Sequence, residues 1–335
     1  MRGRVGGRAV RTSVSRASWV VSGVLVALTW LAAGCTDAGG SAPTPASTAG
    51  QGRPTATATP AVTTATPIVA TGDLLTRRPY RLVAPSSDGD AKPAPLILVL
   101  HGYGQGADYD TLGLDVLAER EGALVVHPEG SRDAVGRRFW NASPACCNFF
   151  EQAVDDIEYL RVVIDDVSAR HAVDPRRVYV AGFSNGGFMA HRLACEMPNR
   201  IAAIVTAAGV NAADGEACGS GEPVAVLQVH GDADPVVHYL GGRFGAGTVP
   251  YPSVATSIEG WSERNGCAQE PEVRETVLDL AATLPGEETS VTRYEECAEG
   301  GAVELWTVHG GSHDIDFSSM FPDAVWSFME EHARS

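Results

Sequence analysis

Positive charge is scarce in this sequence of 335 residues. Its 25 lysine and arginine residues stand against 41 aspartate and glutamate residues, for a formal net charge of −16 at pH 7. Five of the arginines lie in residues 1–35, and without that segment the net charge is −21. Basic side chains supply most of the affinity of proteins for the phosphates of nucleic acid. The charge balance therefore argues against a nucleic-acid partner and against electrostatic binding to anionic lipid.

A hydrophobic run long enough to span a membrane is also lacking at the N-terminus. The run from Trp19 to Ala33 is shorter than the roughly 20 residues that a spanning helix needs, and it follows a start that has arginines and no acidic residue. This pattern is typical of a secretory signal. Small residues precede Cys35, which predicts a lipoprotein signal peptide over residues 1–35 and a lipid anchor on Cys35. The alternative is ordinary cleavage near this point, which would release a secreted protein.

The cysteines lack the spacing of a metal site. No C-x-x-C pair or cysteine–histidine cluster occurs, so we expect neither a metal nor another cofactor. Besides Cys35, six cysteines remain: Cys146, Cys147, Cys195, Cys218, Cys267 and Cys297. An even number in an exported chain predicts disulfides, with 15 possible connectivities. We expect Cys267 to pair with Cys297, and the adjacent Cys146 and Cys147 each to join one of the other two.

The chain shows no internal repeat, but its composition changes along its length. Residues 36–71 consist almost entirely of threonine, alanine, proline, glycine and serine. So little apolar surface cannot offset the entropy of ordering, which predicts a flexible tether. From residue 72 to residue 335, apolar strand-like runs alternate with amphipathic helical segments. This alternation predicts one α/β domain with a mostly parallel sheet covered by helices on both faces.

The expected elements are read from short apolar runs and from helical spacing of apolar residues. Buried strands are predicted over residues 95–102, 122–128, 176–184, 201–209, 224–231 and 302–310. Helices are predicted over residues 153–171, 186–197, 253–266 and 320–333.

One short pattern predicts a catalytic nucleophile. Gly182-x-Ser184-x-Gly186 lies between a predicted strand and a predicted helix, which is the context of a nucleophile elbow. A serine hydroxyl is a weak nucleophile until a histidine takes its proton and an acid orients that histidine. In sheets of this kind the three residues follow in the order serine, acid, histidine.

The acid and the histidine are sought after later strands. Asp234 is preferred as the acid because a two-residue gap lets the chain turn away from the strand end, and Asp232 is the alternative. His313 lies beyond a glycine-rich bend from which it can reach the serine. His309 is expected to lie within the strand, where the sheet would hold it away.

The negative charge that develops on a substrate oxygen needs hydrogen-bond donors. The backbone N–H of Asn185, at the start of the helix after the nucleophile, is the first candidate. The backbone N–H of Tyr103, in the glycine-containing loop after a buried strand, is the second.

Several segments resemble a known family. Residues 100–105, 145–147, 154–156, 177–187, 230–237, 261–267 and 310–313 are similar to exported α/β-hydrolase esterases, the polyhydroxybutyrate depolymerase-like proteins with the related feruloyl and acetylxylan esterases. The resemblance spans about residues 78–333 and implies a triad of Ser184, Asp234 and His313. One departure concerns the substrate: the family commonly has a tryptophan shortly after the histidine, and here Asp-Ile-Asp-Phe follows His313.

We therefore expect an exported serine carboxylic ester hydrolase of the α/β-hydrolase fold that works through an acyl-enzyme. An acyltransferase on the same fold and a non-catalytic binding protein are the alternatives. No long lid insertion separates residue 187 from residue 224, so an open site for small or polymer-attached esters is expected. Trp140 is either a wall of that site or part of the core.

Overall fold

The computed structural model describes residues 71–86, 92–212, 218, 221–245 and 247–334. The expected signal peptide with Cys35, and all of the expected tether except its last residue, lie outside these ranges. None of the helices in the described ranges is both long enough and apolar enough to cross a membrane.

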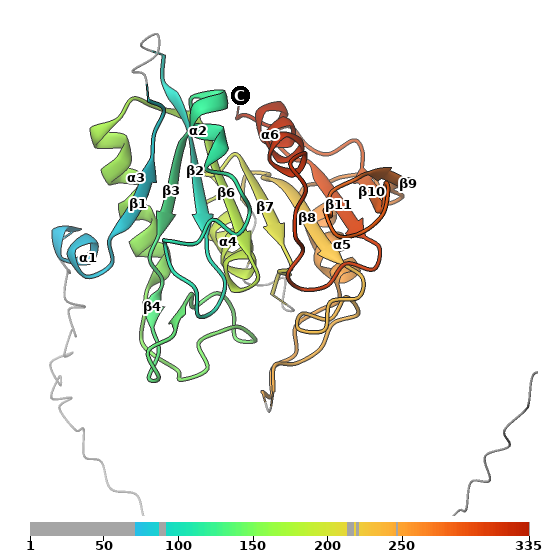
Figure 1. Ribbon diagram of the computed structural model, residues 1–335, viewed down its shortest axis with the longest axis horizontal. Helices are drawn as coiled ribbons and strands as arrows, with labels where there is room; N and C mark the ends of the chain where they lie inside the picture. The colour runs from blue at the N-terminus through green and yellow to red at the C-terminus, as the bar shows by residue number, and fades with distance from the viewer. Residues whose placement is uncertain (1–70, 87–91, 213–217, 219–220, 246, 335) are drawn as a thin grey trace, which may run out of the picture. The chain divides into compact units, whose positions relative to one another are not determined.

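A nine-stranded sheet forms the centre of the described chain, in the order β1-β3-β2-β6-β7-β8-β11-β10-β9 (Figure 1). The six strands from β3 to β11 in this order run parallel, whereas β1, β10 and β9 at the two edges pair antiparallel. The strands are β1 Tyr80–Val83, β2 Ala94–Leu100, β3 Leu124–Pro128, β6 Val173–Phe183, β7 Ala203–Ala207, β8 Ala225–Gly231, β9 Glu272–Leu278, β10 Thr289–Tyr294 and β11 Val303–Val308. Strands β4 Ser131–Arg132 and β5 Arg138–Phe139 form a separate ribbon.

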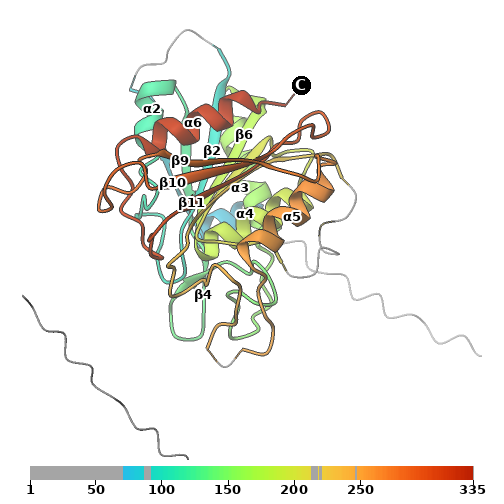
Figure 2. The same cartoon turned by 90° about the vertical axis from the view of Figure 1, so that its right-hand side faces the viewer.

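Helices cover both faces of the sheet (Figure 2). They are α1 Thr71–Arg77, α2 Val116–Glu121, α3 Asp156–Arg170, α4 Asn185–Glu196, α5 Val254–Arg264 and α6 Phe321–Glu331. One buried cluster joins the sheet to α3, α4 and α5, and a second joins it to α2 and α6. Because both faces of the parallel strands are covered, these strands are apolar throughout rather than alternating.

The predicted fold class is confirmed, since every expected buried strand and helix is present within a few residues of its predicted bounds. The edge strands β1, β9 and β10 were not predicted. Most of β9 is exposed, and β10 buries Thr289 and Ser290, so neither segment shows the continuous apolar run by which a buried strand is recognised.

Disulfide pairing agrees with the sequence at one bond and corrects it at the others. Cys267 pairs with Cys297 as expected. Cys195, in the last turn of α4, pairs with Cys218 instead of with the adjacent cysteines. Cys146 therefore bonds to its neighbour Cys147 across a cis peptide. The expectation that a mutual bond would be avoided was wrong, because Cys195 and Cys218 approach each other to a Cα–Cα distance of 4.5 Å and leave no other cysteine partner in the described ranges.

Two histidines are buried with the apolar core. His191 on α4 is fully buried, and its Nδ1 accepts a hydrogen bond of 2.9 Å from Nε1 of Trp261 on α5. Nδ1 of His101, which follows β2, donates to the carbonyl of Gly102, and its Nε2 accepts from the N–H of Gly130. Burial lowers the pKa of His191 to about 3 and that of His101 to about 4.

We predict that these histidines make stability depend on pH. Both titrate near 6.5 in the unfolded chain, so the unfolded state binds more protons below pH 6.5 and the free energy of unfolding falls as the pH falls. Each neutral histidine contributes a slope of up to about 1.4 kcal/mol per pH unit. Urea titrations between pH 6.5 and 5 should show this slope, and His191→Gln should reduce it whatever its effect on absolute stability. An unchanged slope in the variant would contradict the assignment.

Candidate active site

The serine expected at the elbow lies on a sharp turn between β6 and α4. Ser184 has φ 52° and ψ −119°, a conformation that residues other than glycine rarely adopt. A Cβ on Gly182 would collide with the backbone of Gly186, and a Cβ on Gly186 would collide with the carbonyl of Leu100. The two glycines are therefore required by close backbone approach. The turn leaves Ser184 partly exposed, whereas its neighbours in the sequence on both sides are buried.

The structure brings Ser184, His313 and Asp234 into one chain of hydrogen bonds. Nε2 of His313 lies 3.0 Å from Oγ of Ser184, and Nδ1 of His313 lies 2.8 Å from Oδ2 of Asp234. The three residues follow β6, β8 and β11, whose carboxyl ends meet at one edge of the sheet. The ring of Phe183 packs 5.2 Å from that of His313, centroid to centroid.

Asp234 is a buried carboxylate, and its surroundings keep it ionised. Burial alone would raise its pKa, but hydrogen bonds from His230 and His313 and from the N–H of Val236 outweigh burial and lower the pKa below its usual value. Oδ1 accepts from the N–H groups of Val236 and Val237 at 2.7 and 2.9 Å. A charged acid in this position favours a proton on Nδ1 of His313 and leaves Nε2 free to accept one.

The alternative acid and the alternative histidine bond to each other. Oδ2 of Asp232 lies 2.9 Å from Nδ1 of His309, and the side chain of Ser184 bonds to His313 instead. His309 follows directly after β11 rather than lying within it, so the expected position inside the strand was wrong by one residue.

The two backbone N–H groups expected to face the substrate oxygen, those of Asn185 and Tyr103, have no acceptor among the described residues. Asn185 is the first residue of α4, so its N–H has no acceptor within the helix. In the loop after β2, Gly102 donates its N–H to Oε1 of Gln105 and Gly104 donates to the carbonyl of Arg138. The N–H of Tyr103 between them has no acceptor among the described residues.

The side chain of Asn185 has a second role that the sequence did not indicate. It is fully buried, its Oδ1 accepts from the N–H of Trp140 at 2.7 Å, and its Nδ2 donates to the carbonyl of Trp140 at 3.0 Å. Nδ2 also lies 3.6 Å from Sγ of Cys146. These bonds fix the segment with the adjacent disulfide against the start of α4.

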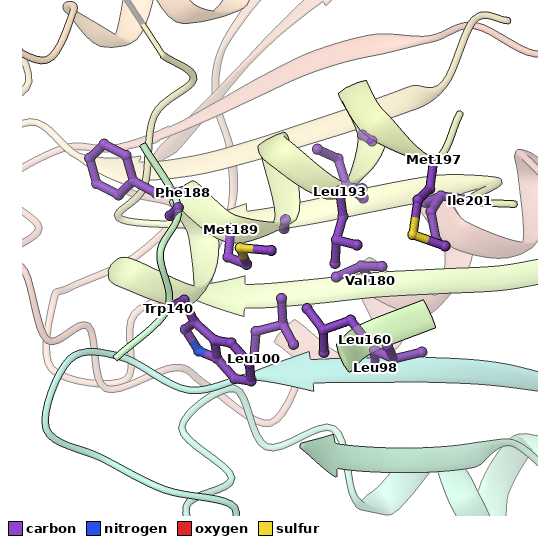
Figure 3. Close-up of a cluster of buried hydrophobic side chains, with 14 of the residues drawn as sticks. Leu98, Leu100, Trp140, Leu160, Val180, Phe188, Met189, Leu193, Met197 and Ile201 are labelled. Atoms are coloured by element: carbon purple, nitrogen blue, oxygen red, sulfur yellow. The ribbon is translucent and has the colours of Figure 1, made fainter. Parts of the chain in front are cut away.

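Trp140 is part of the core and does not form a wall of the site. Its side chain is 0% exposed, and it packs beside Leu100 of β2 within the cluster under α4 (Figure 3). Its Nε1 donates to the carbonyl of His101 at 2.9 Å. The polar atom of the indole is thus satisfied inside the protein, and of the two expected roles only core packing agrees with the structure.

Four other aromatic rings lie in contact with one another near the first turn of α4, and their exposure ranges from buried Phe188 to exposed Phe149. Tyr103, Phe149, Phe244 and Phe188 form a row, which we call the aromatic row, with successive ring centroids 5.4, 6.1 and 6.0 Å apart. The row joins the loop that carries the Tyr103 N–H to the first turn of α4. Phe149 is 48% exposed. Phe188 also lines a cavity of about 330 Å³ beside residues 141–144.

One group of side chains has the donor types of a cation site. Ligand atoms of Asp110, Asp115 and His127 lie within 4.8 Å of one another. Oδ1 of Asp115 already bonds Nε2 of His127 at 2.6 Å, and its Oδ2 pairs with Arg81 at 2.8 Å. Both oxygens of Asp110 accept backbone N–H groups of the following turn. Internal bonds and the charge of Arg81 therefore oppose a cation here.

An α/β sheet with a serine at a positive-φ turn, followed in order by an acid and a histidine at the strand ends, defines an α/β-hydrolase. The family model described as esterase PHB depolymerase matches residues 80–254, about half of the chain. The chain belongs to this esterase family, which confirms the resemblance seen in the sequence.

Individual relatives agree with this assignment. The chain is 34% identical to NocK of Nocardia uniformis subsp. tsuyamanensis, which is described as an esterase, over 78% of this chain and 75% of that protein. It is 28% identical to feruloyl esterase B of Piromyces equi over 74% of this chain, and the match spans only 44% of that protein's length.

Solved structures support the fold alone, because their sequence identity is low. An acetyl xylan esterase from Aspergillus awamori superposes with a TM-score of 0.57 at 16% identity and covers 78% of this chain and 96% of its own. A thermostable esterase superposes with a TM-score of 0.50 at 17% identity, over 77% of this chain and 60% of its own.

Proposed function

We propose that this chain hydrolyses carboxylic esters with Ser184 as nucleophile, His313 as general base and acid, and Asp234 as the orienting acid. The observation that carries the proposal is the continuous bond chain from Ser184 Oγ through His313 to Asp234, with separations of 3.0 and 2.8 Å. Membership of the esterase family supports the reaction class.

The first half of the reaction follows from this geometry. Nε2 of His313 accepts the hydroxyl proton while Oγ of Ser184 attacks the ester carbonyl carbon, and ionised Asp234 stabilises the imidazolium. The N–H groups of Tyr103 and Asn185 donate to the oxygen that becomes negative. The imidazolium then protonates the leaving alcohol as its C–O bond breaks, so the acyl group remains on Ser184.

The second half repeats these steps with water. His313 takes a proton from water as its oxygen attacks the acyl carbon, and the same two N–H groups stabilise the oxyanion. The proton then returns from His313 to Oγ of Ser184 as the acid product leaves.

Short or aromatic acyl groups fit the surroundings of Ser184 best. Between α4 and β8, the described residues form strand β7 and short connections but no lid helix. The aromatic row ends at Phe188 in the first turn of α4 and includes the exposed ring of Phe149. Aromatic pairs prefer offset or edge-to-face contact. Relatives named feruloyl esterase and poly(3-hydroxyalkanoate) depolymerase act on esters of an aromatic acid and on a polyester, as their names state.

We also propose that the protein is exported and held to the membrane by a lipid on Cys35, with residues 36–71 as a tether and residues 72–335 as the catalytic domain. The basic and apolar start of the sequence supports export. Disulfides at Cys195–Cys218 and Cys267–Cys297 are typical of an oxidising compartment.

The nucleophile is tested by Ser184→Ala. We expect turnover of p-nitrophenyl acetate to fall by about 10⁶-fold, the loss that follows removal of a serine nucleophile from a triad. Asp234→Asn should cost about 10⁴-fold, because asparagine stabilises the wrong tautomer of the histidine. Circular dichroism should show both variants folded. Ser184→Ala activity within tenfold of the unmodified protein would contradict the proposal.

The aromatic row is tested with two esters of the same alcohol. Phe149→Ala and Phe244→Ala should raise KM for methyl ferulate roughly 2- to 12-fold more than for methyl acetate, which corresponds to the loss of an aromatic contact of about 0.5–1.5 kcal/mol. Phe150→Ala is the matched control, since this neighbouring ring is also exposed and lies outside the row. Equal rises for both esters would contradict the role, as would faster turnover of long-chain triglycerides than of short esters.

The anchor is tested by Cys35→Ala in the full chain expressed in a bacterium that processes lipoproteins. We expect the protein to move from the membrane fraction to the medium or to remain uncleaved, because a lipid on this cysteine is the proposed source of membrane affinity. Unchanged membrane association with complete processing would show that the anchor is not Cys35.

A further inference from the structure

A second aspartate–histidine–serine chain lies beside the first. Nδ1 of His309 is 2.9 Å from Oδ2 of Asp232, and Nε2 of His309 is 3.0 Å from Oγ of Ser290. These separations match those of Ser184, His313 and Asp234 within 0.1 Å or less. Asp232, His309 and Ser290 thus have the residue types and the hydrogen-bond spacing of a catalytic triad.

The position of Ser290 argues against a second nucleophile. Ser290 lies inside β10, opposite Thr307 of β11, and is 7% exposed. A strand interior has no helix N-terminus to donate to an oxyanion, and its backbone N–H groups belong to the sheet ladder. Ser290 therefore serves as a fixed hydrogen-bond partner that holds the ring of His309.

Asp232 connects the two loops that carry the other partners of Ser184. Asp232 lies two residues before Asp234, and His309 lies four residues before His313. The Asp232 carboxylate makes two hydrogen bonds to the loop after β11: Oδ2 bonds His309, and Oδ1 accepts from the N–H of Gly310 at 2.7 Å. The backbone adds a bond of 3.1 Å from the N–H of Asp232 to the carbonyl of Val308.

The exposure of Asp232 and His309 favours a role in positioning over a role in stability. The side chains of His309 and Asp232 are 42% and 37% exposed, whereas those of His313 and Asp234 are 10% and 0% exposed. Exposed ion pairs contribute only about 0–1 kcal/mol to stability. A misplacement of about 1 Å in a reacting group, however, can cost about 10²-fold in rate. Loss of the pair should thus affect turnover far more than stability.

We propose that Asp232 and His309 form a clamp that positions His313 and Asp234 over Ser184, and this inference rests on the proposed esterase function. Asp232 holds the start of the loop after β11 at two points, so the path of the chain from His309 to His313 is fixed relative to the end of β8. Both residues are positioning residues and touch no substrate.

The test compares Asp232→Ala, Asp232→Asn, His309→Ala and the double alanine variant on p-nitrophenyl acetate. For Asp232→Ala we expect kcat to fall about 10- to 100-fold, with KM within twofold and the melting temperature within a few degrees. Asparagine can still accept from Gly310 and donate to His309, so Asp232→Asn should recover most of the lost turnover. The double variant should resemble Asp232→Ala, because the two residues act as one unit.

Glu272→Ala is the matched control, since it removes another exposed ion pair, with Arg274, on the edge strand β9. It should leave kcat unchanged. Unaltered kcat in Asp232→Ala, no recovery in Asp232→Asn, or multiplicative losses in the double variant would overturn the clamp.

Fluorophosphonate labelling separates this result from the proposed function. We expect one label for each protein molecule and none in Ser184→Ala. Labelling of Ser290 would overturn the clamp in favour of a second reactive serine. If Ser184→Ala is inactive and Asp232→Ala is normal, the clamp fails alone, whereas an active Ser184→Ala means that the proposed function itself fails.

Discussion

Close contact between backbones at the elbow determines where Ser184 lies. Gly182 lies against Gly186, and Gly186 lies against the carbonyl of Leu100 at the end of β2, so neither position has room for a side chain. β2, β6 and α4 meet only because both residues are glycine. The turn between them holds Ser184 at a positive φ, at a cost of about 1–3 kcal/mol that the buried strands on either side must offset.

The same kind of contact fixes the other half of the site. A Cβ on Gly231, at the end of β8, would collide with the backbone of Gly311, so the loops that carry Asp234 and His313 touch before their side chains interact. Because these loops touch, the Asp234 carboxylate and the His313 ring come within hydrogen-bond distance, which affects the pKa of Asp234. Asp234 is buried next to His313, and the hydrogen bonds that it receives lower its pKa in spite of burial, which keeps it charged where a neutral acid could not stabilise an imidazolium.

The sequence predicted those features that depend on local pattern. The buried parallel strands are recognisable as apolar runs, and the order of Ser184, Asp234 and His313 follows from the positions of strand ends. Features that depend on tertiary contact were missed. β9 pairs on one side only and is mostly exposed, so its sequence has no apolar run. The Cys146–Cys147 bond depends on where α4 places Cys195 relative to Cys218, which residue spacing does not reveal.

Trp140 shows why aromatic residues are difficult to assign from sequence. A tryptophan in a loop suggests a ligand contact, but an indole N–H can be buried wherever a carbonyl accepts it, and the carbonyl of His101 does so here. The aromatic row consists of phenylalanines and a tyrosine from separate loops and α4, and no spacing in the sequence connects them. Asn185 connects the buried Trp140 segment with the turn that carries Ser184. Its side chain fixes the buried Trp140 segment, and its backbone N–H follows Ser184 at the start of α4. Core packing and the position of the proposed oxyanion donor are therefore set by the same residue.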